Sequence, residues 1–180
     1  MVESRVVDTN VLIVASAADD GSSFQPESTP VEEAALRELV LAWLQCFEVD
    51  QNRQVVLDYD WRICSEYQNK LGDQDYGWLA VMAKQDRGEV VWVSLEVDVD
   101  GHAILQPAMA EAVTDLADRK MVAAGLEAIK AGHPCLLTNA CDTDWLDCNQ
   151  TMEAAGLRVE HLLEDWLRAR WQVKHGTGRK

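Results

Sequence analysis

The stretch 5–13, Arg-Val-Val-Asp-Thr-Asn-Val-Leu-Ile, constrains the fold of this chain more than any other. Its two adjacent valines are apolar and β-branched, which predicts a short buried strand that ends at Asp8. The Thr-Asn pair that follows predicts the start of a helix, since both residue types favour helix N-termini. In an open α/β sheet, the carboxyl ends of the strands form the crevice in which sites are built. We therefore expect Asp8 either to cap that helix or to line a site.

Strands and helices are predicted to alternate along the chain. Short apolar runs predict strands at the start of the unit 4–17 and at 54–57, 135–138 and 157–159. Apolar residues at helical spacing predict helices at 31–48, 61–71, 79–82, 115–131, 145–155 and 162–171. A β-rich segment at 89–99, an Asp-Gly turn and a return at 102–105 predict a β-hairpin insert. The alternation predicts an α/β fold with a central, mostly parallel sheet flanked by helices on both faces.

Composition limits the classes of protein to consider. The chain has 180 residues and is 48% apolar, which suits one globular domain; we expect a single domain over 1–173 and a basic tail at 174–180. No apolar run is long enough to span a bilayer, and no signal-peptide pattern opens the chain, so no membrane partner is expected. The five cysteines are odd in number and contain no CxxC pair, which favours a reducing cytoplasm over a disulfide framework or a zinc ribbon.

The net charge of −15 has two opposite implications. It argues against nucleic acid as a partner, because phosphates are drawn to basic surfaces. Yet carboxylates gathered in one place need a cation, and oxygen ligands select Mg²⁺ or Mn²⁺. The last fifteen positions reverse the sign and carry five of the 16 basic residues, namely Arg168, Arg170, Lys174, Arg179 and Lys180. These residues predict either a phosphate-contacting arm, in which Trp166 and Trp171 stack on bases, or a simple helix end.

Acidic residues recur at the ends of the predicted strands and the starts of the predicted helices. They are Asp8, then Asp58 with Glu66 on the next helix, then Asp115 with Asp118, and finally Asp142 with Asp144. Because parallel strands end at one edge of the sheet, these carboxylates are expected to converge, and they cannot all stay ionised without a cation. The chemistry that this arrangement suits is metal-assisted hydrolysis of a phosphodiester. The alternative for Asp58, Asp115 and Asp144 is helix capping.

At these positions the chain resembles the PIN domains, a family of metal-dependent nucleases. The matching stretches are 6–12 (Val-Val-Asp-Thr-Asn-Val-Leu), 66–67 (Glu-Tyr), 118–123 (Asp-Arg-Lys-Met-Val-Ala) and 137–145 (Leu-Thr-Asn-Ala-Cys-Asp-Thr-Asp-Trp). The resemblance implies a PIN-like three-layer fold and the following site residues: catalytic, metal-binding Asp8, Glu66, Asp118 and Asp142, the neighbouring ligand Asp144, and substrate-contacting Thr9, Asn10, Arg119 and Lys120. Two extra residues separate Thr138 from the last motif, which leaves the choice between Asp142 and Asp144 open.

The expected function is a Mg²⁺- or Mn²⁺-dependent endonuclease acting on RNA or single-stranded DNA. Within that class, the chain is expected to be a toxin with an antitoxin or other protein partner, or a processing or defence ribonuclease. A phosphatase of the haloacid dehalogenase type also begins with an aspartate after a strand, but it needs a second one where Asn10 stands. The non-catalytic alternative is a PIN-like module that binds a protein.

A homodimer contact is predicted on the helix 31–48. Its apolar stripe includes Leu39, and Leu41 lies off the stripe and widens the apolar face. A face this wide often exceeds what one core can cover, which predicts self-association. The alternative is a helix buried on two sides within one subunit.

Overall fold

Five parallel strands form the central sheet of the computed structural model, which describes residues 2–176. In spatial order they are β3 (Val90–Val93), β2 (Arg53–Asp58), β1 (Glu3–Val7), β4 (Cys135–Asn139) and β5 (Arg158–His161). The predicted α/β fold is confirmed, and the sheet is parallel throughout. The central strand β1 is buried on both faces, as expected of a strand rich in β-branched residues with helices on each side of the sheet. Its last residue, Val7, pairs with Thr138 in β4.

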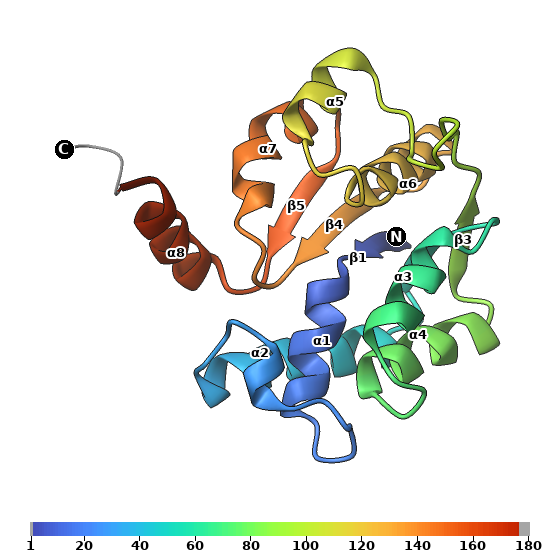
Figure 1. Ribbon diagram of the computed structural model, residues 1–180. Helices are drawn as coiled ribbons and strands as arrows, with labels where there is room; N and C mark the ends of the chain where they lie inside the picture. Colours follow the sequence, from blue (N-terminus) through green and yellow to red (C-terminus); the bar gives the residue numbers. More distant parts are fainter. Residues whose placement is uncertain (1, 177–180) are drawn as a thin grey trace.

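The helices form a layer on each face of the sheet (Figure 1). On one face α1 (Thr9–Ala18), α2 (Ala34–Val49) and α4 (Tyr76–Asp86) pack against one another. On the other lie α5 (Pro107–Ala112), α6 (Arg119–Lys130) and α7 (Asp144–Ala154). Helix α3 (Arg62–Lys70) contacts both α1 and α6, and α8 (Glu164–Gly176) follows β5 at the side of the molecule. This is the three-layer arrangement that the PIN resemblance implies.

Two predicted helices begin three or four residues later than expected. The helix predicted at 31–48 begins at Ala34, and the one predicted at 115–131 begins at Arg119. The reason at α6 is local, because the Asp115 carboxylate accepts the backbone N–H of Ala117 and holds a turn before the helix. Leu39, which the apolar stripe of the helix 31–48 includes, is 60% exposed.

The predicted β-hairpin insert is present but shorter than expected, with backbone hydrogen bonds between Asp98 and His102 and between Ile104 and Glu96. Residues 90–93 pair with β2 as an edge strand of the main sheet, so they belong to the core fold. What remains of the hairpin is one antiparallel bridge, between Val97 and Ala103. Its turn is held by the Asp98 carboxylate, which accepts the backbone N–H groups of Asp100 and His102.

The predicted basic tail is in part helical, since α8 continues through Lys174 to Gly176. Arg179 and Lys180 lie outside the described residues. None of the helices within 2–176 combines the length and apolar character that crossing a membrane requires. All five cysteines are free thiols, and the cytoplasmic location stays a prediction.

Candidate functional site

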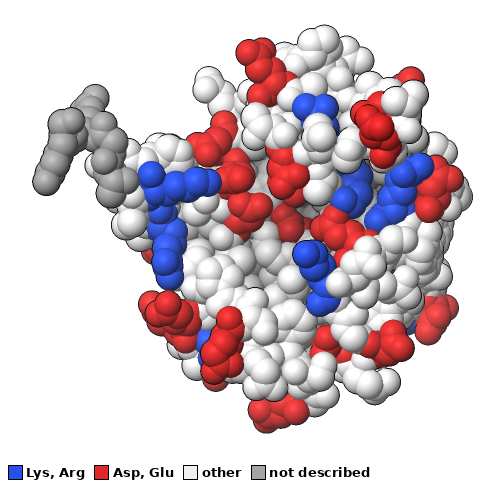
Figure 2. All heavy atoms as spheres, viewed as in Figure 1, with Lys and Arg blue, Asp and Glu red and all other residues white. Residues whose placement is uncertain are grey.

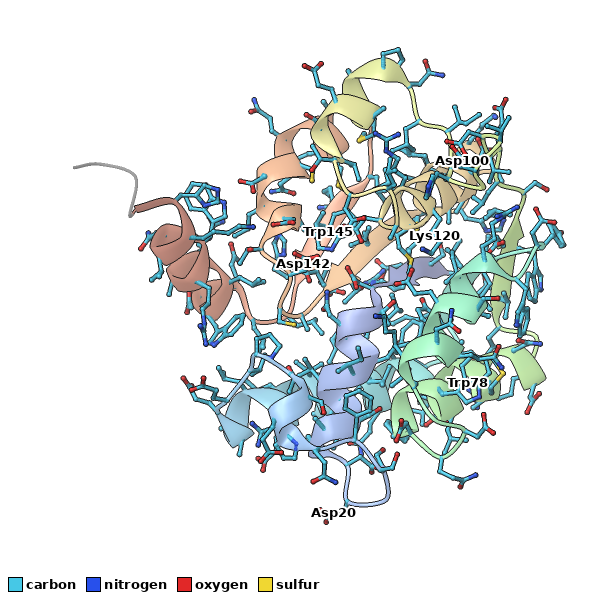
Figure 3. All side chains as sticks on the ribbon, in the orientation of Figure 1. Asp20, Trp78, Asp100, Lys120, Asp142 and Trp145 are labelled. Atoms are coloured by element: carbon cyan, nitrogen blue, oxygen red, sulfur yellow. The ribbon has the colours of Figure 1, made fainter. Side chains whose placement is uncertain are left out.

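The candidate site lies where the order of the strands reverses. From β1 the chain moves outward to β2 and β3, and later returns on the other side to β4 and β5. In such sheets a crevice opens between the carboxyl ends of the two strands at the reversal, here β1 and β4. Asp8 directly follows β1, and Asp142 lies in the turn between β4 and α7. In Figure 3, Asp142 and Trp145 lie together above the N-terminal end of α1, with Lys120 to one side.

Asp8 is the most deeply placed carboxylate of the site, at 7% exposure. It caps α1, with Oδ1 accepting the backbone N–H of Asn10 at 3.0 Å. Its Oδ2 accepts the indole Nε1–H of Trp145 at 2.5 Å. Burial raises the pKa of Asp8 to about 7, and the negative charges of Asp142 and Glu66 add to the rise, while the two hydrogen bonds oppose it. Both expected roles of Asp8, helix cap and site residue, are therefore compatible with its position.

Two further carboxylates are close enough to influence Asp8 and each other. Asp118, at the N-terminal cap position of α6, has its pKa raised to about 8 by burial and then by Asp8 and Asp142. Burial also raises the pKa of Asp142, although the backbone N–H of Asp144 donates to this carboxylate and lowers its pKa. The structure thus gathers Asp8, Asp118 and Asp142 around one crevice, in which full ionisation is disfavoured.

Glu66 joins the group from α3 and is held by two side chains. Thr9 donates its hydroxyl to Oε1, and the Lys120 ammonium pairs with Oε2. Thr9 is therefore a residue that fixes Glu66 from the first turn of α1. Lys120, predicted to contact substrate, is paired with an acid of the site.

Asn10 links the two strands that border the crevice. Its side-chain Oδ1 accepts the backbone N–H of Ala140 at 2.8 Å, and its Nδ2 donates to Asn139 Oδ1 at 3.0 Å. Asn139 in turn accepts the backbone N–H of Asp142 and donates to the carbonyl of the same residue. This amide network sets the path of the turn that carries Asp142, so Asn10 acts on the site through the backbone.

Asp144 lies at the rim of the site, in the first turn of α7. It is exposed, and Lys174 of α8 contacts its Oδ1 at 2.5 Å. A cavity of about 210 Å³ opens beside it, bordered by Asp115, Asp118 and Lys174 among others. Asp142 is thus the deeper of the two candidate ligands and Asp144 the outer one.

The remaining predicted residues have structural partners. The guanidinium of Arg119 donates to the carbonyls of Ala110 and Val113, which ties α5 to the start of α6. Asp58 accepts the backbone N–H groups of Arg62 and Ile63, which confirms the capping interpretation for this residue.

Sequence reasoning missed the roles of Trp145 and Asn139. Trp145 is only 1% exposed, and a buried indole N–H requires an acceptor, so its position in the last motif was the available signal. Asn139 is fully buried at the end of β4, where a polar side chain is uncommon unless it is hydrogen-bonded. Neither partner can be identified without the strand order.

The chemistry of the donor set fits a hard divalent cation. Carboxylate oxygens are the ligands of Mg²⁺ and Mn²⁺, and each oxygen of Asp8 keeps a free lone pair beside its hydrogen bond. Within residues 2–176, no three acidic, histidine or cysteine side chains stand close enough together to hold an ion as they are arranged. Ligation therefore requires these carboxylates to move closer together, which the charge of a cation favours and their mutual repulsion opposes.

The charged side chains on the surface are also concentrated around the site. Figure 2 shows acidic side chains gathered at the centre of the face that bears the site, with basic side chains on either side, including those over α8. The acidic centre thus lies between two groups of positive charge. No family model, curated protein or solved structure matches this chain.

Proposed function

We propose that this protein is a Mg²⁺- or Mn²⁺-dependent nuclease of the PIN type that hydrolyses phosphodiester bonds in RNA or single-stranded DNA. One observation carries the proposal: carboxylates from separate elements converge at the crevice between β1 and β4. Structural needs alone do not explain why buried acids are placed where they raise each other's pKa.

The proposed ligands are Asp8, Glu66, Asp118 and Asp142, with Asp144 at the rim. A bound cation would supply an activated water and neutralise charge on the phosphate. The protein's own contribution is orientation: Trp145 and the N-terminus of α1 hold Asp8, and Thr9 holds Glu66. The Asn10–Asn139 pair sets the turn that presents Asp142.

The test is cleavage of end-labelled single-stranded RNA and DNA by the purified protein, with Mn²⁺, with Mg²⁺ and with EDTA. Cleavage is expected only with a cation, and Asp8→Asn and Asp118→Asn are each expected to abolish it. Asp86→Asn, which removes an exposed acid at the end of α4, is the matched control and should retain full activity. Cleavage that survives both EDTA and Asp8→Asn would assign the activity to another protein in the preparation.

A non-catalytic, protein-binding module is the second candidate, and the net charge of −15 favours it. An acidic surface suits a basic protein partner, such as the antitoxin proposed for a toxin of this type, better than it suits nucleic acid. If no strand is cut under any cation, and calorimetry detects no Mn²⁺ binding, this second candidate takes first place.

A further inference from the structure

Two lysines neutralise the two outer carboxylates of the site. Lys174 on α8 contacts Asp144, and Lys120 on α6 pairs with Glu66. They approach from different elements, and basic side chains border the acidic centre on both sides in Figure 2. Each ammonium group thus stands against an oxygen that belongs to the proposed cation-binding set.

These pairs differ in how strongly they are held. Lys174 and Asp144 are about half exposed, with side-chain exposures of 52% and 54%. Exposed pairs of this kind contribute little to stability, because water and salt screen them. Lys120 and Glu66 are more enclosed, at 17% and 24%, and Lys120 also donates to the carbonyl of Ala117. A divalent cation therefore displaces Lys174 from Asp144 more readily than it displaces Lys120 from Glu66.

We propose that Lys174 is a phosphate-binding residue that stays paired with Asp144 until a divalent cation takes over that carboxylate. The inference rests on the proposed nuclease function and adds to it a residue that couples cation binding to substrate binding. The freed ammonium has three donors and no acceptor, which suits the oxygens of a phosphodiester next to the one being cut.

The surroundings of Lys174 suit a single strand. Trp171, one turn earlier on α8, stacks on His175 with ring centroids 4.3 Å apart, and its indole donates to Asp147 at 2.7 Å. Arg170 lies over the ring of Trp166, 5.0 Å from its centroid. Aromatic rings interleaved with cations bind the bases and phosphates of unpaired strands. The ligand class that fits α8 is therefore single-stranded nucleic acid lying along the helix toward the acidic crevice.

Calorimetric titration with MnCl₂ alone tests the exchange. Lys174→Gln removes the competitor for Asp144 and is expected to tighten Mn²⁺ binding roughly twofold to fivefold. The matched control is Arg168→Gln, which removes a positive charge from the same helix but one that pairs with Glu164 on α8 itself. The control is expected to leave the Mn²⁺ affinity unchanged.

Fluorescence anisotropy of a labelled 12-nucleotide RNA tests the phosphate contact. In Mn²⁺, Lys174→Gln is expected to weaken RNA binding and to lower its salt slope by about 0.7. In EDTA the same substitution is expected to have no effect, because Lys174 is then occupied by Asp144. Asp144→Asn frees the lysine without a cation and is expected to strengthen RNA binding in EDTA, and the double variant Asp144→Asn, Lys174→Gln is expected to lose that gain.

The outcomes separate this inference from the proposed function. Mn²⁺ binding and cleavage in the wild type, with Lys174→Gln indistinguishable from wild type in both assays, would overturn the role of Lys174 alone. An equal loss of RNA binding in EDTA and in Mn²⁺ would also overturn the exchange, since the lysine would then bind phosphate without being freed. A wild-type protein that binds no Mn²⁺ would remove the proposed function and this inference with it.

Discussion

The indole of Trp145 donates to the carboxylate of Asp8 across 137 residues of sequence, at 2.5 Å. Both side chains are buried, Trp145 at 1% exposure and Asp8 at 7%. The bond joins the first turn of α7 to the end of β1 and opposes the rise in the pKa of Asp8. The same tryptophan thus packs the core and keeps a buried acid closer to its ionised form.

Trp145→Phe is expected to move the pH dependence of Mn²⁺ binding upward by about one unit, since the ionised carboxylate loses a charge-assisted hydrogen bond. Calorimetric titrations between pH 6 and 9 measure the shift. Trp166→Phe, a partly exposed indole on α8, is the matched control and should leave the curve in place. An unchanged curve in Trp145→Phe would show that this bond does not govern the ionisation of Asp8.

Stability of the cation-free protein is expected to fall as pH rises from 5 to 8.5. In the folded state the pKa of Asp8 is raised to about 7 and that of Asp118 to about 8, both above the ordinary value of 3.8. Between pH 3.8 and these raised pKa values, the folded state holds protons that the unfolded state has lost, so raising the pH favours unfolding. Thermal unfolding in EDTA at several pH values checks this dependence.

Asp118→Asn removes one of these ionisations and is expected to flatten the dependence, whereas Asp86→Asn should keep it. At pH 8, Mn²⁺ at about 100 times its dissociation constant should raise the free energy of unfolding by roughly 2.7 kcal/mol, because the cation binds only the folded state. A wild-type protein whose melting temperature in EDTA rises over this pH range would contradict the prediction.

The placement of the acids was predictable because it depends on a local rule. A strand that ends in an aspartate puts that side chain at the edge of the sheet, whatever the rest of the fold. Asp8 follows this rule directly, and Asp142 lies three residues beyond the end of β4 in the turn at the same edge. Asp118 is identified by its position at the start of a predicted helix, whereas Glu66 depends on the resemblance, since a lone acid within a helix gives no such signal.

The partners of these acids were not predictable, because they depend on which strands are neighbours. Asn10 meets Asn139 only because β1 lies beside β4. Lys84 shows the same limit elsewhere: it is fully buried, with its ammonium held by Glu89 and by two backbone carbonyls, although lysine is ordinarily a surface residue. Such pairings follow from tertiary packing, which periodicity along the chain does not encode.

Gly77→Ala is expected to destabilise the protein by about 1–3 kcal/mol, because α4 crosses α1 too closely for a methyl group. A Cβ at Gly77 would lie 2.5 Å from the carbonyl oxygen of Leu12, a backbone atom that cannot move alone. The added methyl group is expected to push α1 away from α4. Because α1 begins next to Asp8, this shift should also reduce the Mn²⁺ affinity.

Gly125→Ala on α6 is the matched comparison. There the nearest atoms, at 2.8 Å, belong to the side chain of Leu157, which can rotate, and alanine gains about 1 kcal/mol of helix propensity over glycine. Urea unfolding should show a much smaller loss for Gly125→Ala than for Gly77→Ala. Equal losses would mean that the α1–α4 crossing is not the tighter constraint.

The outer face of α2 offers a specific surface for the predicted self-association. Five of its exposed apolar residues recur at alternating spacings of four and three, and they are Ala35, Leu39, Ala42, Cys46 and Val49. This spacing is typical of the seam between paired helices. Within residues 2–176, α2 is not buried on both sides, because Leu39 is 60% and Val49 is 69% exposed. We therefore expect α2 to pair with α2 of a second copy.

Leu39→Glu is expected to convert a dimer into a monomer in sedimentation velocity runs, because it places a charge in the middle of the seam. Leu79→Glu, at a 43% exposed leucine on α4, is the matched control and should leave the dimer intact. Cys46 supplies an independent readout: mild oxidation should link two chains through it in the wild type, and Leu39→Glu should lower the yield of linked chains. A wild-type protein that sediments only as a monomer at high concentration would rule out the pairing, and α2 would then keep an uncovered apolar face.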